Sequence, residues 1–134
     1  MGSQYETSTG FTTESAPLWA QEAYIKASNN DAVDWFGYSV ALYGDTLVVG
    51  AYKEDSNQTT ITNDNSTASS NNSNTDSGAV YVLTRIQTRR AQQAYMYASN
   101  NYAGDYFCHE FSLHGYTLAA VAKLADSKQT SIFN

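Results

Sequence analysis

An internal repeat occupies more than half of this chain. Residues 20–56 read AQEAYIKASNNDAVDWFGYSVALYGDTLVVGAYKEDS, and residues 91–127 read AQQAYMYASNNYAGDYFCHEFSLHGYTLAAVAKLADS. The copies are offset by 71 residues without a gap, and 18 of the 37 aligned pairs are identical. A repeat of this length predicts stacked equivalent units, so the functional question becomes what a repeat surface binds.

The composition favours strands and polar turns, and it excludes some partners. Tyr occurs 11 times and Pro once, and charged residues make up only 15% of the chain; aromatic residues favour strands. The net charge of −6 argues against a nucleic-acid partner, because a phosphate backbone would be repelled. No apolar run approaches the roughly 20 residues of a membrane helix, so we expect no membrane insertion. The N-terminus also lacks the pattern of a signal peptide.

Three regions are expected along the chain. Residues 1–18 are polar and are interpreted as a flexible arm, residues 19–127 as the repeat domain, and residues 128–134 as a C-terminal tail. Residues 55–77 are nearly all Asn, Ser, Thr, Asp or Gln, and this composition predicts a long mobile loop that cannot bury enough apolar surface to become ordered.

Alternation of apolar residues predicts an all-β fold. A tight turn is expected at Gly44, and the almost continuously apolar segment before Tyr52 is typical of a strand that is covered on both faces. The seven predicted strands are residues 20–27, 36–42, 46–52, 78–85, 91–98, 107–113 and 117–122.

A constellation of residues in the first copy resembles the FG-GAP repeat. Phe36-Gly37 matches the Phe-Gly motif of that family, and Gly50-Ala51 matches its Gly-Ala-Pro motif except that Tyr52 stands in the Pro position. The resemblance covers residues 19–122 and implies antiparallel four-stranded blades of the β-propeller type. It also implies a non-enzymatic binding or adhesion module of an extracellular or cell-surface protein.

The second copy departs from this pattern. It keeps Phe107 and the turn residue Gly115, but Cys108 replaces the first glycine of the motif and Val121 replaces Gly50. We therefore expect the second unit to differ in blade geometry. Seven strands make fewer than two blades, whereas a closed propeller has about 4–8. The chain is thus expected to be part of a larger propeller, to complete its fold by oligomerisation, or to form a small β-sandwich or barrel.

Candidate chemistry is sparse. Asp31 and Asp34, in the loop before the Phe-Gly motif, are the candidate calcium ligands, although Asx residues in turns explain them as well. The pairs Glu54 with Asp55 and Asp31 with Asp34 are interpreted as solvated loop acids, so we predict no catalytic residue, no enzyme and no cofactor beyond calcium.

The aromatic residues point to binding. They exceed what a small core needs, so some are expected either to form a binding platform or to pack within and between blades. These residues are Tyr24, Tyr38, Tyr43, Tyr52, Tyr81, Tyr95, Tyr97, Tyr102, Tyr106, Trp19 and Trp35.

Three functional hypotheses follow. The first is a module that binds a protein or glycan surface. The second is a self-associating structural β protein, and the third is a carbohydrate-binding accessory piece of a secreted hydrolase.

Overall fold

A computed structural model describes residues 16, 18–59, 61–63, 71–87 and 89–125. Over these residues the chain forms strands and no helix, which confirms the all-β prediction. The strands are β1 (Ser39–Tyr43), β2 (Thr46–Ala51), β3 (Ala79–Ile86), β4 (Arg89–Met96), β5 (Phe107–His114) and β6 (Thr117–Ala122).

The first four strands form one antiparallel sheet in the order β1-β2-β3-β4. This sheet is consistent with the antiparallel four-stranded blade unit predicted from the sequence. The predicted coverage of β2 is also confirmed. Its residue Val49 belongs to the core cluster on one face, together with Tyr81 and Tyr95. Its residue Val48 belongs to a second cluster on the opposite face.

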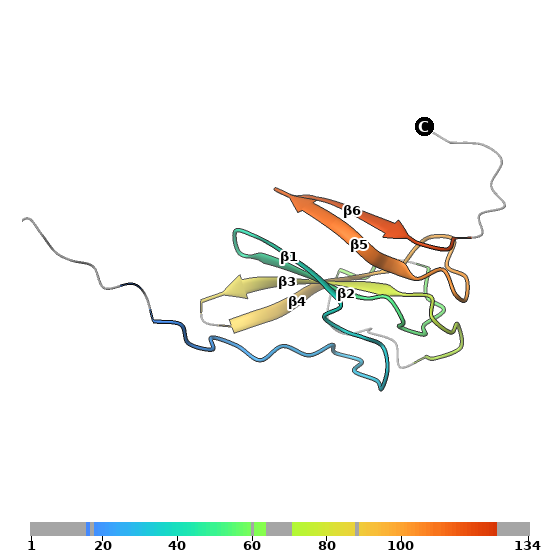
Figure 1. Cartoon of the computed structure of the whole chain (residues 1–134), viewed down its shortest axis with the longest axis horizontal. Helices are drawn as coiled ribbons and strands as arrows, with labels where there is room; N and C mark the ends of the chain where they lie inside the picture. The colour runs from blue at the N-terminus through green and yellow to red at the C-terminus, as the bar shows by residue number, and fades with distance from the viewer. Residues whose placement is uncertain (1–15, 17, 60, 64–70, 88, 126–134) are drawn as a thin grey trace, which may run out of the picture.

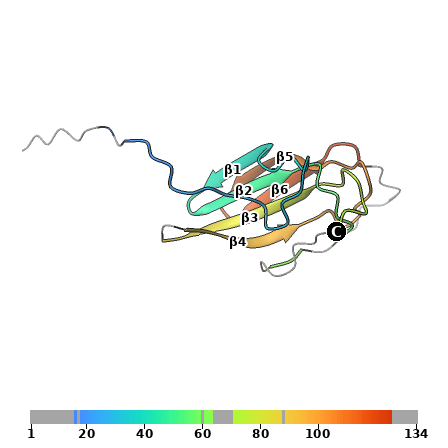
Figure 2. The same cartoon turned by 90° about the horizontal axis from the view of Figure 1, so that it is seen from below.

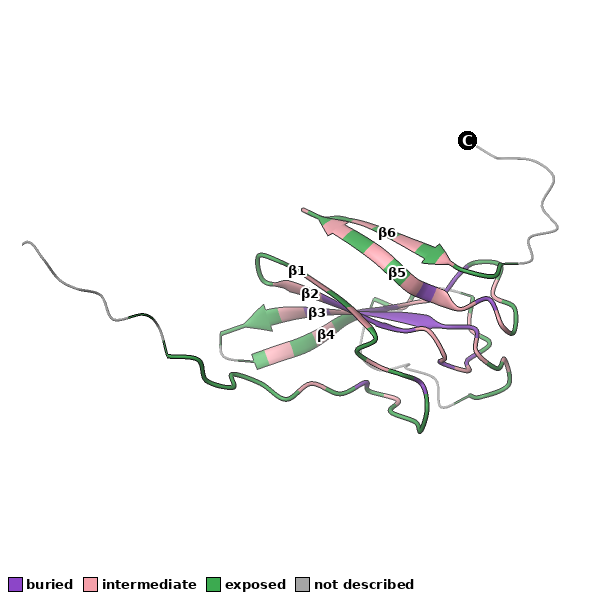
Figure 3. Cartoon of the chain, viewed as in Figure 1, coloured by how far each residue is buried: buried purple, intermediate pink, exposed green. Residues whose placement is uncertain are grey.

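The four-stranded sheet is the middle layer of the molecule (Figure 1). The segment that precedes β1 runs along one face, and the β5-β6 hairpin lies on the other (Figures 1 and 2). Ile25 and Phe36 pack from that segment onto the first core cluster. Phe107 and Phe111 pack from β5 onto the second cluster. The buried residues accordingly gather at the centre of the sheet and at the start of β5 (Figure 3).

The predicted strand at residues 20–27 is wrong, because the structure assigns no strand to these residues. Most of the equivalent residues of the second copy, 91–96, lie in β4, where β3 provides a hydrogen-bonded partner along one edge. The described residues provide no such strand beside residues 20–27. A sequence that is competent to form a strand therefore stays irregular when a partner is lacking, because strand propensity depends on cross-strand neighbours.

The second copy repeats the geometry of the first, contrary to expectation. The β5-β6 pairs Glu110↔Val121 and His114↔Thr117 are the β1-β2 pairs Ser39↔Gly50 and Tyr43↔Thr46, each shifted by 71 residues. Positive φ angles recur at matched positions as well, namely Val33 and Gly104, Trp35 and Tyr106, Gly37 and Cys108, and Gly44 and Gly115.

The substitution of glycine by Cys108 is accommodated locally. Cys108 keeps a φ of 67° where Gly37 has 92°, and the β5-β6 register shifts between Phe107 and Glu110. A β-bulge of this kind absorbs an irregular residue without loss of the hairpin. The Cys108 side chain is fully buried against β2 and β3, and this burial raises the pKa of its thiol to about 12.

The ends of the predicted polar loop are more ordered than their composition suggests. Ser56 and Ser77 are fully buried, and the Ser77 hydroxyl donates to the carbonyl of Ser56 at 2.8 Å. Thr62 forms a bridge with Tyr95 of β4. The prediction that this composition prevents burial is wrong at these positions, because small hydroxyl side chains can satisfy buried backbone carbonyls. Residues 64–70 lie outside the described part of the chain.

Candidate functional site

The residues of the predicted structural motif lie in the hairpin turns and in the core of the sheet. Gly44 and Gly115 occupy the two matched hairpin turns with φ of 56° and 59°. Ala51 is buried in the core cluster that includes Tyr81, and Phe36 meets Tyr81 edge-on at 5.1 Å between ring centroids.

Gly50 lies at a close approach of the two copies. A Cβ atom at this position would lie 2.9 Å from the backbone oxygen of Cys108 and 2.3 Å from Oγ of Ser39. Ser39 in turn donates to that same Cys108 oxygen at 3.1 Å. The absence of a side chain at Gly50 therefore lets β5 lie directly against β2.

Asp34, one of the two calcium candidates, is a buried turn residue. Its carboxylate accepts a hydrogen bond from the backbone N–H of Asp31, and its backbone oxygen accepts one from Lys53 at 3.3 Å. Asp105 repeats both contacts in the second copy, with the backbone N–H groups of Tyr102 and Leu124. The role that Asp34 and Asp105 share is to hold the turn before the first strand of each unit.

Asp31, the other candidate, is exposed. Its carboxylate accepts hydrogen bonds from the backbone of Ala32 and from the side chain of Asn72, and these bonds hold its pKa below the ordinary value. The described residues contain no group of three or more His, Cys, Asp or Glu side chains placed to hold a metal ion. Calcium binding by Asp31 and Asp34 stays a prediction.

Glu54 is the most unexpected residue of the structure. The sequence suggested a solvated loop acid, and that interpretation is wrong, since Glu54 is only 1% exposed. Its Oε1 accepts from Nδ2 of Asn29 at 2.8 Å, and its Oε2 accepts from the backbone N–H of Ser56 at 2.9 Å. Burial raises the pKa of Glu54 to about 7.

A group of buried tyrosines completes this polar cluster. Tyr81 donates its hydroxyl to Oδ1 of Asn29 at 2.7 Å, and Asn29 donates Nδ2 to the Tyr95 hydroxyl at 3.0 Å. Burial raises the pKa values of Tyr81, Tyr95 and Tyr97, so these phenols stay protonated. The cluster fastens the loop of Asn29 and the loop of Glu54 onto the sheet. It is enclosed, since Glu54, Tyr81 and Tyr95 are each at most 1% exposed.

A second aromatic group lies at the surface, where the two copies adjoin. We call it the aromatic platform, and its members are Trp35, Tyr38, Tyr52, Tyr106 and His109. Tyr52 is central, with ring centroids at 4.5 Å from Tyr38, 5.0 Å from His109, 5.5 Å from Tyr106 and 5.7 Å from Trp35.

The platform combines rigidity with exposure. Trp35 is 49% exposed and Tyr38 is 48% exposed, while the other three rings are partly buried beneath them. Lys53 lies 5.8 Å from the Trp35 ring centroid and pairs with Asp76 at 4.0 Å. Such an arrangement can offer large apolar contacts at little cost in side-chain entropy.

The platform is a product of the repeat. Tyr106 is the equivalent of Trp35, and His109 is the equivalent of Tyr38. The aromatic residue types predicted a binding surface, but that prediction did not include His109. The offset of 71 residues was the signal that could have paired these rings, because matched positions of adjacent units lie close together.

Comparison with known families decides what the first unit is. Residues 19–83 match the family model of the FG-GAP repeat. Over these residues the chain is similar to an FG-GAP repeat. The match spans β1, β2 and most of β3, and it includes Tyr52, which stands where the motif has proline. No curated protein and no solved structure matches the chain.

FG-GAP repeats are β-propeller-type units that typically serve as non-catalytic binding modules, and they occur in extracellular proteins. The open arrangement of a four-stranded and a two-stranded sheet is consistent with incomplete propeller blades. Within the part of the chain that the structure describes, no helix is long and apolar enough to cross a membrane.

Proposed function

We propose that this FG-GAP chain is a non-enzymatic binding module of an extracellular protein, and that it binds a protein or glycan surface through the aromatic platform. The observation that carries the proposal is the meeting of five rings from both copies, with Trp35 and Tyr38 outermost. Exposed aromatic rings on a rigid support are the side chains that most often dominate binding energy.

The departure of the sequence from its family motif supports this proposal. Tyr52 replaces the proline of the motif and contacts every other ring of the platform. A proline there would remove the ring that Trp35 and Tyr38 both contact. The platform is therefore a property of this chain and not of the motif alone.

Removal of the Trp35 ring should abolish most of the binding. A screen of the intact chain against arrays of extracellular proteins and of glycans identifies a binding surface, and calorimetry then compares the wild type with Trp35→Ala. We expect an affinity loss of roughly 30-fold or more, since aromatic hot spots cost about 2 kcal/mol or more when truncated.

Tyr116→Ala is the matched control. Tyr116 is fully exposed in the β5-β6 turn and makes no ring contact within the described residues, so its loss should leave the affinity unchanged. Equal losses in the two variants, or no binding on either array, would argue against the platform as the functional surface.

Self-association is a second candidate function, favoured by an exposed apolar row on β1. Val40 and Leu42 pair with Val49 and Leu47 and lie on the same face of the sheet, but they extend past the covering N-terminal segment and are exposed. In addition, β6 has β5 as its one strand partner within the described residues. Exposed apolar rows and open strand edges favour association with further strands.

The mass in solution tests this candidate. Light scattering after size exclusion should give a multiple of 14.7 kDa, and Leu42→Lys should shift the distribution toward the monomer. Thr46→Lys, on the opposite face of the adjacent strand, serves as the charge control. A wild-type chain that remains a folded monomer at millimolar concentration would eliminate self-association.

A further inference from the structure

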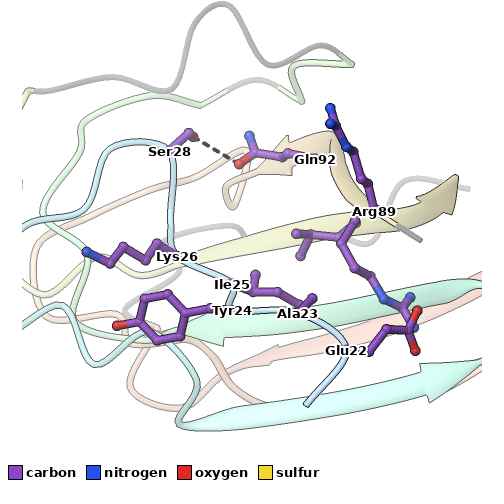
Figure 4. Close-up of a pocket in the computed structure, with 10 residues that line it drawn as sticks. Glu22, Ala23, Tyr24, Ile25, Lys26, Ser28, Arg89 and Gln92 are labelled. Atoms are coloured by element: carbon purple, nitrogen blue, oxygen red, sulfur yellow. Dashed lines mark hydrogen bonds between the residues drawn. The ribbon is translucent and has the colours of Figure 1, made fainter. Parts of the chain in front are cut away.

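A pocket lies between the N-terminal segment and the β3-β4 hairpin, on the side of the sheet that bears the first core cluster. It has a volume of about 450 Å³. Figure 4 shows the segment from Glu22 to Ser28 facing Arg89 and Gln92 across this pocket. None of the platform residues lines it, so it is separate from the proposed binding surface.

The charge around this pocket is opposite to that of the whole chain. The chain carries a net charge of −6, yet the pocket is lined by Lys26, Arg89 and Arg90 with Glu22 as its one carboxylate. Glu22 is itself 3.7 Å from Arg85. Neither Lys26 nor Arg89 forms a salt bridge within the described residues. Among the described residues, Lys26 and Arg89 therefore have no carboxylate partner, and the Lys26 ammonium lies 5.6 Å from the centroid of the Tyr24 ring.

One residue that lines the pocket, Gln92, also carries a buried hydrogen-bond donor. Oε1 of Gln92 accepts from the Ser28 hydroxyl at 2.9 Å, as the dashed line in Figure 4 marks, whereas Nε2 of Gln92 is buried and has no hydrogen-bond partner among the described residues. A buried polar group without a partner costs about 1–3 kcal/mol, so such groups are rare unless a ligand or water satisfies them. Cations and an unpaired amide N–H together form a donor set for an oxyanion.

We infer that this pocket binds the carboxylate of an acidic sugar, such as a hexuronate residue of a glycan. A volume of about 450 Å³ is that of a small-ligand pocket and exceeds what one Asp or Glu side chain would fill. Tyr24 offers an exposed ring at the rim for the sugar ring, and Ser28 and Gln92 offer polar groups for its hydroxyls. The cations provide the charge that a neutral sugar would not need.

The test is a titration of the intact chain with trigalacturonate, in which binding is monitored by the amide chemical shifts in NMR spectra. We expect shifts confined to residues 22–28 and 89–92, and an affinity that falls as salt is raised because the charges are partly exposed. Galactotriose, the neutral counterpart, should bind at least tenfold more weakly. Hexaglutamate tests whether an acidic peptide binds the pocket instead, and it should not displace trigalacturonate.

Substitutions locate the site. Arg89→Ala should weaken trigalacturonate binding about tenfold, as expected for loss of one charge-assisted contact, while Lys123→Ala, which removes an exposed cation elsewhere, should not. Trp35→Ala should leave uronate binding intact, which separates this inference from the proposed platform. Any of four results would overturn the inference. These are no chemical-shift change with trigalacturonate, equal affinity for galactotriose, higher affinity for hexaglutamate, and an Arg89→Ala variant that binds trigalacturonate as tightly as the wild type.

Discussion

Replacement of Gly50 by valine is expected to destabilise the chain by about 3 kcal/mol, the upper end of the cost of overpacking a filled core. The new side chain would begin 2.9 Å from the backbone oxygen of Cys108, and backbone cannot rotate away as a side chain can. The β5-β6 hairpin would have to lift from β2, and the fully buried Cys108 would become accessible. Urea denaturation gives the free energy of unfolding, and reaction of the thiol with an alkylating reagent reports the lifted hairpin.

The repeat supplies the control for this experiment. Val121 occupies the equivalent position in the second copy and is 54% exposed. Val121→Thr should change the free energy of unfolding by less than about 0.5 kcal/mol, as is usual for surface substitutions. If Gly50→Val unfolds at the same urea concentration as the wild type, the conclusion that the two copies pack closely at Gly50 is wrong.

The chain is also expected to lose stability as the pH rises from about 4.5 to about 7. The pKa of Glu54 is about 7 in the folded protein, above the ordinary value of 4.5, because burial disfavours the carboxylate. When the pKa of a group is higher in the folded state than in the unfolded state, the group stabilises the folded state fully at pH values below its unfolded-state pKa. This stabilisation is lost as the pH rises through the pKa of the folded state. Glu54 alone should contribute a change of about 3 kcal/mol. Asp34, with a pKa raised to about 6 by burial, acts in the same direction.

Glu54→Gln isolates this contribution. A glutamine stays neutral at every pH and keeps an oxygen for the hydrogen bonds of Asn29 or Ser56, so it resembles the protonated acid. Urea denaturation at a series of pH values should show a shallower slope for this variant and higher stability than the wild type above pH 7. Glu110→Gln, at an exposed position of β5, should reproduce the wild-type slope. Parallel curves for the wild type and Glu54→Gln would refute the role of Glu54.

Much of the fold follows from local patterns. The alternating and apolar runs located β1 to β6 and their order, because those patterns reflect burial on one or both faces of a strand. The same reasoning placed a strand at residues 20–27, where the structure has none. Local sequence records the propensity of these residues but not whether a neighbouring strand is present to receive them.

The polar cluster shows a different limit. Glu54 lies at the start of a polar stretch, and nothing in its neighbours along the chain distinguishes it from a solvated acid. Its burial depends on Asn29 and Tyr95, which are distant in sequence and converge only in the folded chain. The aromatic platform lies between these cases. Its Tyr and Trp members were predicted to be surface candidates, His109 was not, and the grouping of the rings is encoded in the offset between the copies.

Fluorescence of Trp35 is the most direct measurement of the central claim that the platform is the binding surface. Trp19 and Trp35 are the two tryptophans of the chain, and Trp19 is fully exposed at a position outside the platform. In Trp19→Phe, Trp35 is the sole tryptophan emitter. Saturation with a binding partner is expected to quench or blue-shift this emission, because the partner covers the ring and excludes water. Unchanged emission at full saturation would contradict it.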